Sequence, residues 1–197
     1  MTSSVSAIAC SPSGRYIACG TYGGQGTGKN DEDGDGFLRV FDICSSEEVT
    51  AVSTEQLDVN LVSFSPNEIF VASCGTNNQT VIYDWRFPKQ PLYLLLHQDP
   101  LSENISGTSS EGITGIQWID NGNFLLTGGA DGCIHLWNLR LQNPLVHTYA
   151  LKMPVCRFSL IEEDLELAVG VVGGAVQFFS GNDKNKGVTW NISERNE

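Results

Sequence analysis

The spacing of four related positions limits what this chain can fold into. Asp42, Asp84, Asn138 and Ser180 each close a short apolar stretch of the kind that forms a β-strand. The interval from Asp42 to Asp84 is 42 residues, and the interval from Asn138 to Ser180 is also 42 residues. The middle interval is 54 residues, and a polar insertion at 98–112 accounts for the excess. This period indicates an array of structural repeats.

The stretch Leu125–Arg140, LLTGGADGCIHLWNLR, is the clearest copy of the repeat. It predicts two short strands joined by a turn at 128–132, because alternating apolar residues flank a glycine-rich segment. Each copy contains four predicted strands, and no helical period interrupts the series. The chain is therefore expected to be all-β, with four-stranded antiparallel sheets packed face to face around an axis. The four copies are expected over 5–54, 59–96, 113–150 and 155–192.

Two segments of this copy resemble the end of a WD repeat. They are Gly-Ala-Asp-Gly at 129–132 and Leu-Trp-Asn-Leu-Arg at 136–140, with Asn138 in place of the usual aspartate. The resemblance covers nearly the whole chain and implies a β-propeller built from four-stranded blades. WD-repeat propellers most often have seven blades. With four copies, the resemblance implies an incomplete ring whose two terminal blades expose apolar faces.

The same resemblance assigns a structural role to a set of polar and aromatic residues. Thr127, Asp131 and Trp137 are similar to members of the hydrogen-bonded network that holds WD-repeat blades together, and His97 corresponds to its histidine. A buried indole and a buried imidazole both need hydrogen-bond partners. His135 and His147 lie in predicted strands without a carboxylate or cysteine at ligand spacing. We interpret both of these as ordinary strand histidines.

We call Asp42, Asp84, Asn138 and Ser180 the signature positions, and the residues that follow two of them suggest a partner. Asp84-Trp85-Arg86 and Asn138-Leu139-Arg140 both place an arginine two residues after the signature position. Successive repeats of this form resemble the WD-x-Arg box of substrate receptors for cullin-4 ubiquitin ligases. The resemblance implies that Arg86, Arg140, Asp84 and Trp85 contact the ligase adaptor. An exposed guanidinium suits bidentate recognition of a carboxylate. The alternative is that each arginine only covers the end of its strand.

Charge and cysteine content restrict the remaining possibilities. The net charge is −12, so the surface disfavours phosphate backbones and anionic membranes, and we expect no direct nucleic-acid or membrane partner. None of the six cysteines has zinc-site spacing. We interpret them as reduced, structural residues beside strands, which favours an intracellular location, nuclear or cytoplasmic. The N-terminus lacks the features of a signal peptide, and no apolar run is long enough to span a membrane.

The acidic, glycine-rich loop at 22–36 is compatible with two other readings. Gly23-x4-Gly28-Lys29 approximates a phosphate-binding loop, but Asn30 and an acidic run follow, which disfavours a nucleotide. Asp31, Asp33 and Asp35 match the start of a calcium loop, although strands flank the segment. The alternative function is therefore a calcium-binding propeller or a metal-dependent enzyme using these carboxylates. Calcium titration by calorimetry would separate that alternative from a solvated acidic loop.

The sequence contains no convergent set of acid, base, nucleophile and metal ligands. We therefore expect a non-catalytic scaffold for protein–protein interactions, without a cofactor. It would serve as an adaptor or substrate receptor in a cullin-4 type ubiquitin ligase or a chromatin-associated assembly. The topology places the loops at 22–36 and 98–112 on one face, suited to a basic client, and Arg86 and Arg140 on the opposite face.

Overall fold

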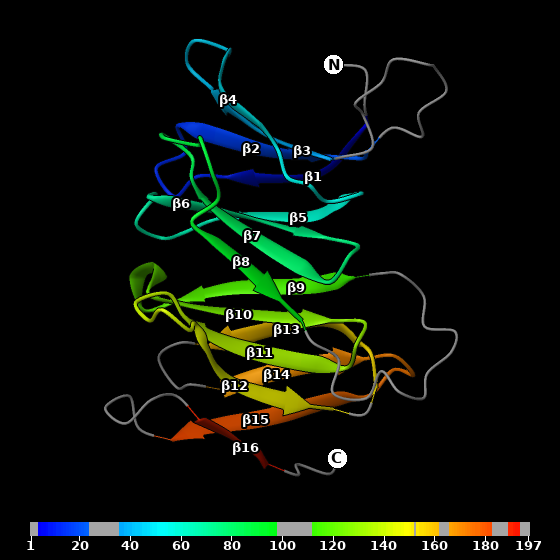
Figure 1. Cartoon of the computed structure of the whole chain (residues 1–197). Helices are drawn as coiled ribbons and strands as arrows, with labels where there is room; N and C mark the ends of the chain where they lie inside the picture. The colour runs from blue at the N-terminus through cyan, green and yellow to red at the C-terminus, as the bar shows by residue number, and fades with distance from the viewer. Residues whose placement is uncertain are drawn as a thin grey trace.

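The chain forms four sheets that stack one upon the next (Figure 1). The computed structural model describes residues 4–23, 36–97, 112–151, 153–161, 166–182 and 189–193. Each sheet has four antiparallel strands, arranged in the order in which they occur along the chain. We number the sheets blade 1 to blade 4 in chain order. The predicted all-β fold of four four-stranded antiparallel sheets is therefore confirmed.

The strands of each blade have the following bounds. Blade 1 contains β1 (Val5–Cys10), β2 (Tyr16–Thr21), β3 (Phe37–Asp42) and β4 (Glu47–Ser53). Blade 2 contains β5 (Val59–Phe64), β6 (Phe70–Gly75), β7 (Gln79–Asp84) and β8 (Tyr93–Leu96). Blade 3 contains β9 (Ile113–Ile119), β10 (Phe124–Gly129), β11 (Cys133–Asn138) and β12 (Leu145–Ala150). Blade 4 contains β13 (Val155–Ile161), β14 (Glu166–Val171), β15 (Val176–Asn182) and β16 (Thr189–Ser193).

Helical structure is minimal in the described residues. A single 3-10 turn, η1 (Asp120–Gly122), joins β9 to β10. In this part of the chain, no helix has the length and apolar character needed to cross a membrane.

The alternation of side chains along β11 shows why the blades must stack. Ile134 and Leu136 pack in a core shared with blade 4, whereas Trp137 packs in a core shared with blade 2. Successive side chains of a strand point to opposite faces of the sheet, so β11 presents an apolar surface on both sides. One sheet cannot bury two apolar faces without a neighbour on each side.

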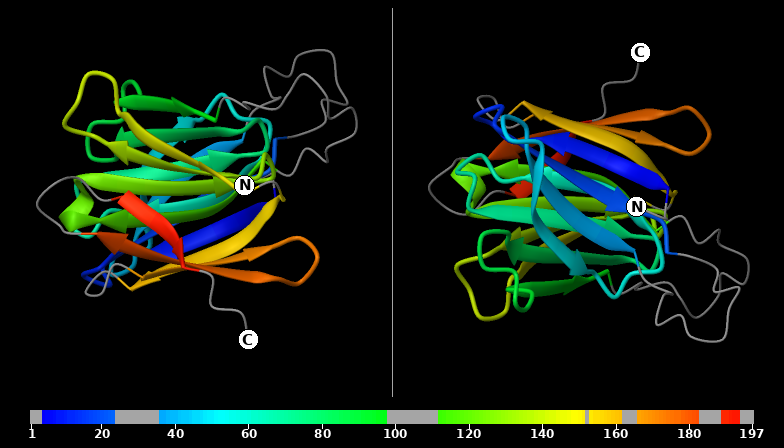
Figure 2. Two further views of the ribbon diagram at one scale, coloured as in Figure 1. Left: turned by 90° about the horizontal axis from the view of Figure 1, so that it is seen from below. Right: turned by 90° about the horizontal axis from the view of Figure 1, so that it is seen from above.

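The first strands of the blades lie next to one another in space. β1 packs against β5, β5 against β9, and β9 against β13. Figure 2 views the array from both ends, with blade 4 nearest in the view from below and blade 1 nearest in the view from above. The described residues do not close a ring, and the end blades expose apolar side chains such as Ile8 (65%) and Val176 (56%). The expected incomplete ring is confirmed for the described residues.

Hydroxyl side chains at matching positions join successive blades. Ser6 Oγ on β1 donates to the carbonyl oxygen of Val59 on β5, at 2.5 Å. Thr114 Oγ1 on β9 donates to the carbonyl oxygen of Val155 on β13, also at 2.5 Å. Both contacts run from the first strand of one blade to the first strand of the next, so they fix the relative position of neighbouring blades.

Replacing Thr114 with valine is expected to lower the free energy of unfolding by about 1–2 kcal/mol. Valine keeps the shape of the side chain, so the loss reports the hydroxyl, which also lies 3.3 Å from the Gly128 carbonyl oxygen. Denaturant unfolding followed by tryptophan fluorescence measures the change. An unchanged midpoint would mean that the Val155 carbonyl finds another donor.

The cysteines differ in burial. All six are free; Cys19, Cys74 and Cys133 are buried, whereas Cys10, Cys44 and Cys156 are exposed. Burial raises the pKa of the Cys74 thiol to about 12, so this thiol stays protonated and packs as a small apolar group. All six lie in or beside strands, as expected: Cys10 and Cys156 are on β1 and β13, and Cys44 follows the end of β3. The exposed three are not part of the core.

Candidate functional site

Four side chains predicted to form a network lie in one hydrogen-bonded chain between blades 2 and 3. Trp137 Nε1 donates to Thr127 Oγ1 at 2.8 Å. His97 Nε2 lies 2.6 Å from Thr127 Oγ1, and His97 Nδ1 lies 2.9 Å from Asp131 Oδ2. His97 directly follows β8 of blade 2, whereas Thr127, Asp131 and Trp137 belong to blade 3. A single histidine therefore connects the polar interior of one blade to the next.

The hydrogen bonds assign one tautomer to His97. The Thr127 hydroxyl accepts the Trp137 N–H, so its own proton points to His97 Nε2, and His97 donates from Nδ1 to Asp131. Burial lowers the pKa of His97. Burial alone would raise the pKa of Asp131, but attraction to His135 and His97 outweighs it and holds that pKa well below its usual range. A neutral imidazole thus faces an ionised carboxylate.

His135 lies in the same cluster, and our expectation that no carboxylate lies near it is wrong. Its Nε2 is 3.8 Å from Asp131 Oδ2, and its Nδ1 is 2.9 Å from Thr148 Oγ1. The physical reason is the turn before β11, where Gly132 has a φ of 74°. That left-handed conformation reverses the chain tightly, so residues four apart face each other. The Asp-Gly turn placed before a strand histidine is the sequence signal that could have revealed this contact.

Within the described residues, His97, Asp131 and His135 form a group whose donor atoms all lie within 4.8 Å of one another. Such a group could hold a metal ion. However, His97 Nδ1 and Asp131 Oδ2 already bond to each other, and the three side chains are at most 2% exposed. A metal ion would have to displace these hydrogen bonds. The geometry favours a structural network, and the absence of a metal stays a prediction.

Asp42, Asp84 and Asn138 share a local role at the ends of the third strands, whereas Ser180 lies inside β15, so the expectation that it closes a strand is wrong. In each case Oδ1 accepts the backbone N–H two residues later, at 2.8 Å for Asp42, 3.2 Å for Asp84 and 3.0 Å for Asn138. The side-chain oxygen closes the turn that leads to the fourth strand. An amide oxygen accepts this bond as a carboxylate oxygen does, which explains how Asn138 can replace aspartate in blade 3.

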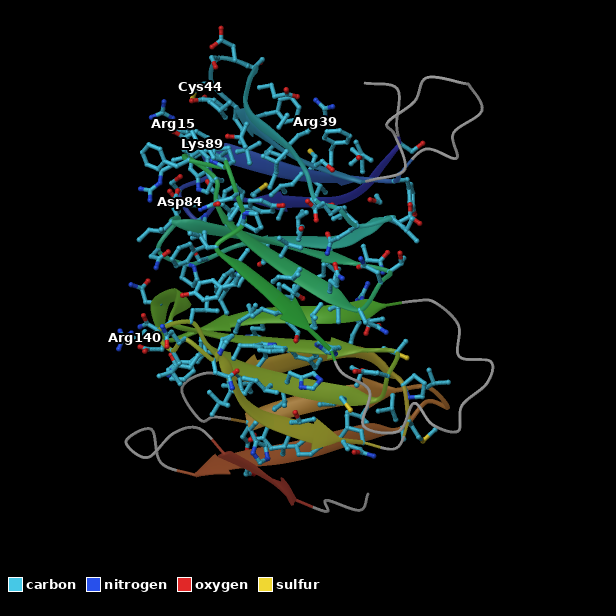
Figure 3. All side chains as sticks on the ribbon, in the orientation of Figure 1. Arg15, Arg39, Cys44, Asp84, Lys89 and Arg140 are labelled. Atoms are coloured by element: carbon cyan, nitrogen blue, oxygen red, sulfur yellow. The ribbon has the colours of Figure 1, made fainter. Side chains whose placement is uncertain are left out.

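The two arginines predicted to contact a partner have different surroundings. Arg86 Nε lies 2.9 Å from Asp84 Oδ1, and Arg86 Nη2 lies 2.8 Å from Asp84 Oδ2. Hydrogen bonding to Arg86 lowers the pKa of Asp84. In blade 3 the neutral Asn138 offers no such pair, and Arg140 Nε donates to Asn123 Oδ1 at 3.0 Å. Figure 3 shows Asp84 and Arg140 at the same edge of the stack.

The residue between the signature position and the arginine is buried in both blades. Trp85 is 6% exposed and Leu139 is 7% exposed. The preceding blade holds each of them: Thr50 Oγ1 donates to the Trp85 carbonyl oxygen at 2.6 Å, and the Tyr93 hydroxyl donates to the Leu139 carbonyl oxygen. Trp85 also donates its indole N–H to the Glu68 carbonyl oxygen at 2.9 Å. Trp85 therefore packs inside the sheet interface, where it supports Arg86 and offers little surface to a partner.

The remaining candidate residues divide into two groups. Asp31, Asp33 and Asp35, the possible calcium ligands, lie outside the described residues, as does the insertion at 98–111. His147 lies on β12, with its ring centroid 4.3 Å from that of Tyr149. This tilted ring contact agrees with an ordinary strand histidine.

Comparison with known proteins identifies similar chains. The family described as WD domain, G-beta repeat matches residues 2–42 and 100–138. Rik1-associated factor 1 of Schizosaccharomyces pombe is 36% identical over 151 residues, which are 74% of this chain and 23% of that protein. WD repeat-containing protein 46 of Caenorhabditis elegans is 25% identical over 145 residues, which are 74% of this chain and 22% of that protein. The chain thus spans less than a quarter of these curated relatives.

A solved structure supports the same architecture. The structure described as the Dos1 propeller is 29% identical to this chain and superposes with a TM-score of 0.73. The match covers 90% of this chain and 41% of that one. The four stacked sheets of this chain therefore have the arrangement found in part of a longer propeller.

Proposed function

This chain belongs to the WD-repeat β-propeller family, and we propose that it is a non-catalytic scaffold for protein–protein interactions. We propose further that the two turns at 84–87 and 138–141, together called the arginine edge, dock the adaptor of a cullin-4 type ubiquitin ligase. The chain would then act as a substrate receptor or adaptor, in a ligase or a chromatin-associated assembly. A basic client on the opposite loops, and a nuclear or cytoplasmic location, belong to the same proposal.

The observation that carries this proposal is the repetition of one rigid turn in neighbouring blades. In both turns the signature residue closes the backbone, the next residue is buried, and the arginine projects at the surface. The preceding blade holds both turns by a hydrogen bond to the buried residue. A surface that is already ordered loses little conformational entropy when a partner binds. Two such sites on one edge favour a specific contact over two unrelated strand ends.

The comparison with relatives supports a binding role. Rik1-associated factor 1 is named for its association with another protein. Propellers host unrelated functions, so the fold alone does not select among them. The six unpaired cysteines support an intracellular location, because disulfides are rare in reducing compartments.

The test is the affinity of the full chain for a purified cullin-4 ligase adaptor, measured by surface plasmon resonance. We expect the double variant Arg86→Ala/Arg140→Ala to bind about 100-fold more weakly, because two interface arginines are lost. Arg39→Ala is the matched control, since Arg39 also forms an exposed pair within its blade, with Glu48 at 2.6 Å. Equal affinities of the wild type and the double variant would show that the arginine edge is not the docking surface.

A further inference from the structure

We infer that the outer faces of blade 1 and blade 4 are docking surfaces for a second copy of this chain. Blade 4 of one copy packs against blade 1 of the other, and two such junctions close one ring. With four blades from each copy, this ring stays within the range of roughly four to eight blades known for propellers. The inference goes beyond the proposed function and does not depend on what the arginine edge binds.

A glycine on the second strand marks two of the junctions between blades. A Cβ atom added to Gly20 of blade 1 would lie 2.4 Å from Val59 and 3.2 Å from Val62, both on β5 of blade 2. A Cβ atom added to Gly128 of blade 3 would lie 2.9 Å from Phe158, on β13 of blade 4. A side chain from the first strand of the next blade therefore occupies the space over each glycine, and the glycine allows the two sheets to approach closely.

Blade 4 has the same glycine, but the next blade is missing. In blade 1, Gly20 lies across from Leu38 on the third strand. In blade 4, Gly170 lies across from Val176 in the same register. Among the described residues, a Cβ atom on Gly170 would meet only the Arg157 carbonyl oxygen of its own blade, at 3.6 Å. Leu38 is fully buried, whereas Val176 is 56% exposed. Blade 4 therefore carries an open notch at Gly170 and Val176.

A second position of the third strand repeats this difference. Val40, Ile82 and Leu136 pair with the third residue of their second strands, and all three are fully buried. Phe178 has the same pairing in blade 4 and is 42% exposed. The outer face of blade 4 thus has the side chains of a buried sheet surface without a cover. Exposed apolar surface of this kind marks an interaction site.

Blade 1 offers the side chain that fits this notch. Ile8 occupies on β1 the position that Val62 occupies on β5 and Phe158 on β13, since each lies across from the fourth residue of its second strand. Val62 is buried and Phe158 packs against the core shared by blades 3 and 4, whereas Ile8 is 65% exposed. Because Val62 and Phe158 pack over the glycines of the preceding blades, Ile8 is placed to pack over Gly170 of a second copy.

The hydrogen bonds between first strands follow the same order. Ser6 and Thr114 are the second residues of β1 and β9, and each hydroxyl donates to the carbonyl oxygen of the first residue in the next first strand. Cys156 is the second residue of β13 and is exposed. At the junction, its thiol would face the Val5 carbonyl oxygen of the second copy. A thiol is a weaker donor than a hydroxyl, so the apolar contact dominates.

The two end faces complement each other, and this selects the second copy as the occupant. Blade 4 supplies the notch, whereas blade 1 supplies the side chain that fills it. Such a head-to-tail contact is heterologous, and heterologous contacts form closed rings when the rotation between copies permits. One kind of chain provides both halves of the contact. Two copies therefore cover all four exposed end faces with two identical junctions.

The first experiment measures the mass of the full chain by sedimentation velocity at micromolar concentration. We expect the mass of two chains. Ile8→Glu and Val176→Glu are each expected to weaken this pairing at least about 30-fold, because each would bury a charge without a partner. Phe87→Glu is the matched control, since it places the same charge on an exposed apolar residue outside both end faces.

Thermal melting checks that every variant is folded. A wild-type chain with the mass of one copy would overturn the inference and leave the end faces to other proteins. Open assemblies of three or more copies would overturn the closed ring. Equal effects of Phe87→Glu and Ile8→Glu would show that pairing does not use the end faces.

Mixing Ile8→Glu with Val176→Glu tests the head-to-tail geometry. In a mixed pair, one junction joins the unaltered blade 4 of the first variant to the unaltered blade 1 of the second. We expect mixed pairs to form at least about fivefold more tightly than pairs of either variant alone. A fluorescent label on one variant identifies mixed pairs in sedimentation. Loss of pairing in only one of the two variants would indicate a contact between like blades and would overturn the inference.

The exposed cysteines provide a readout without a change in the end faces. Cys10 lies on β1 two residues after Ile8, so both side chains share the outer face of blade 1. Cys156 lies at the proposed junction, whereas Cys44 follows β3 and lies outside it. N-ethylmaleimide labelling is followed at each cysteine by mass spectrometry. We expect pairing to slow labelling of Cys10 and Cys156 at least about fivefold and to leave Cys44 unchanged. Labelling of Cys10 and Cys156 that is independent of protein concentration would contradict the inference.

Discussion

Replacing Asp131 with alanine is expected to lower the free energy of unfolding by about 3–5 kcal/mol. The carboxylate is 2% exposed, bonds to His97 Nδ1 at 2.9 Å, and accepts the N–H of Cys133 at 3.0 Å. Its removal leaves both donors buried without an acceptor, and such groups cost more than an average hydrogen bond contributes. Denaturant unfolding measures the loss. Asp84→Ala is the control, because its exposed pair with Arg86 is expected to contribute less than about 1 kcal/mol.

The same network makes stability depend on pH in a defined direction. Because the pKa of His97 is lowered in the folded state, the unfolded chain takes up a proton near pH 6.5 that the folded chain resists. The pKa of Asp131 is also lowered, so its contribution is present above its ordinary value of 3.8 and is lost as the pH falls towards the folded value. We expect stability to decline from pH 7 to pH 3, which denaturant unfolding at a series of pH values measures. A free energy of unfolding that stays constant over this range would contradict this account.

Replacing Gly112 with alanine is expected to lower the free energy of unfolding by more than about 3 kcal/mol. A Cβ atom at this position would lie 2.2 Å from the Gly75 carbonyl oxygen and 2.5 Å from Thr76 Cα. These are backbone atoms of blade 2, so neither can move aside cheaply. The Gly112 carbonyl oxygen also accepts the N–H of Ala130 at 2.9 Å, which connects the start of β9 to the turn that carries Asp131.

Gly14→Ala is the matched control for this substitution. Gly14 has a φ of 71°, close to the 65° of Gly112, but a Cβ atom at Gly14 would meet no other atom within 4 Å. Both variants bear the cost of a left-handed conformation, about 1–2 kcal/mol. Only Gly112→Ala adds a collision with a neighbouring blade. Similar melting temperatures for the two variants would show that the backbone of blade 2 shifts to make room for the added Cβ atom.

The strands were predictable because their signals are local. A second strand was expected after the turn at 128–132, and β11 spans Cys133–Asn138. Its alternation and the Asp-Gly turn before it both act within a few residues. The repeat interval then indicated that one strand pattern recurs, so the same reasoning applied to each blade.

The contacts between blades were not predictable from residue patterns. His97 and Asp131 are 34 residues apart, and only the family resemblance paired them. His135 was assigned to an ordinary strand position, although it faces Asp131. Gly112 was included in a polar insertion without a role. Each of these contacts depends on how closely two segments approach after the sheets have stacked. A local sequence pattern does not predict that distance.

The sequence by itself determined the repeating sheet, the turn chemistry at Asp84 and Asn138, and the presence of an arginine after each. Only the tertiary structure decided that Arg140 contacts the Asn123 amide, whereas Arg86 pairs with Asp84, two residues away in the sequence. The choice of Asn123 as the contact of Arg140 depends on where the connection between β9 and β10 meets the end of β11. That meeting is set by sheet packing, because side chains distant in the sequence are brought together only when their apolar faces are buried.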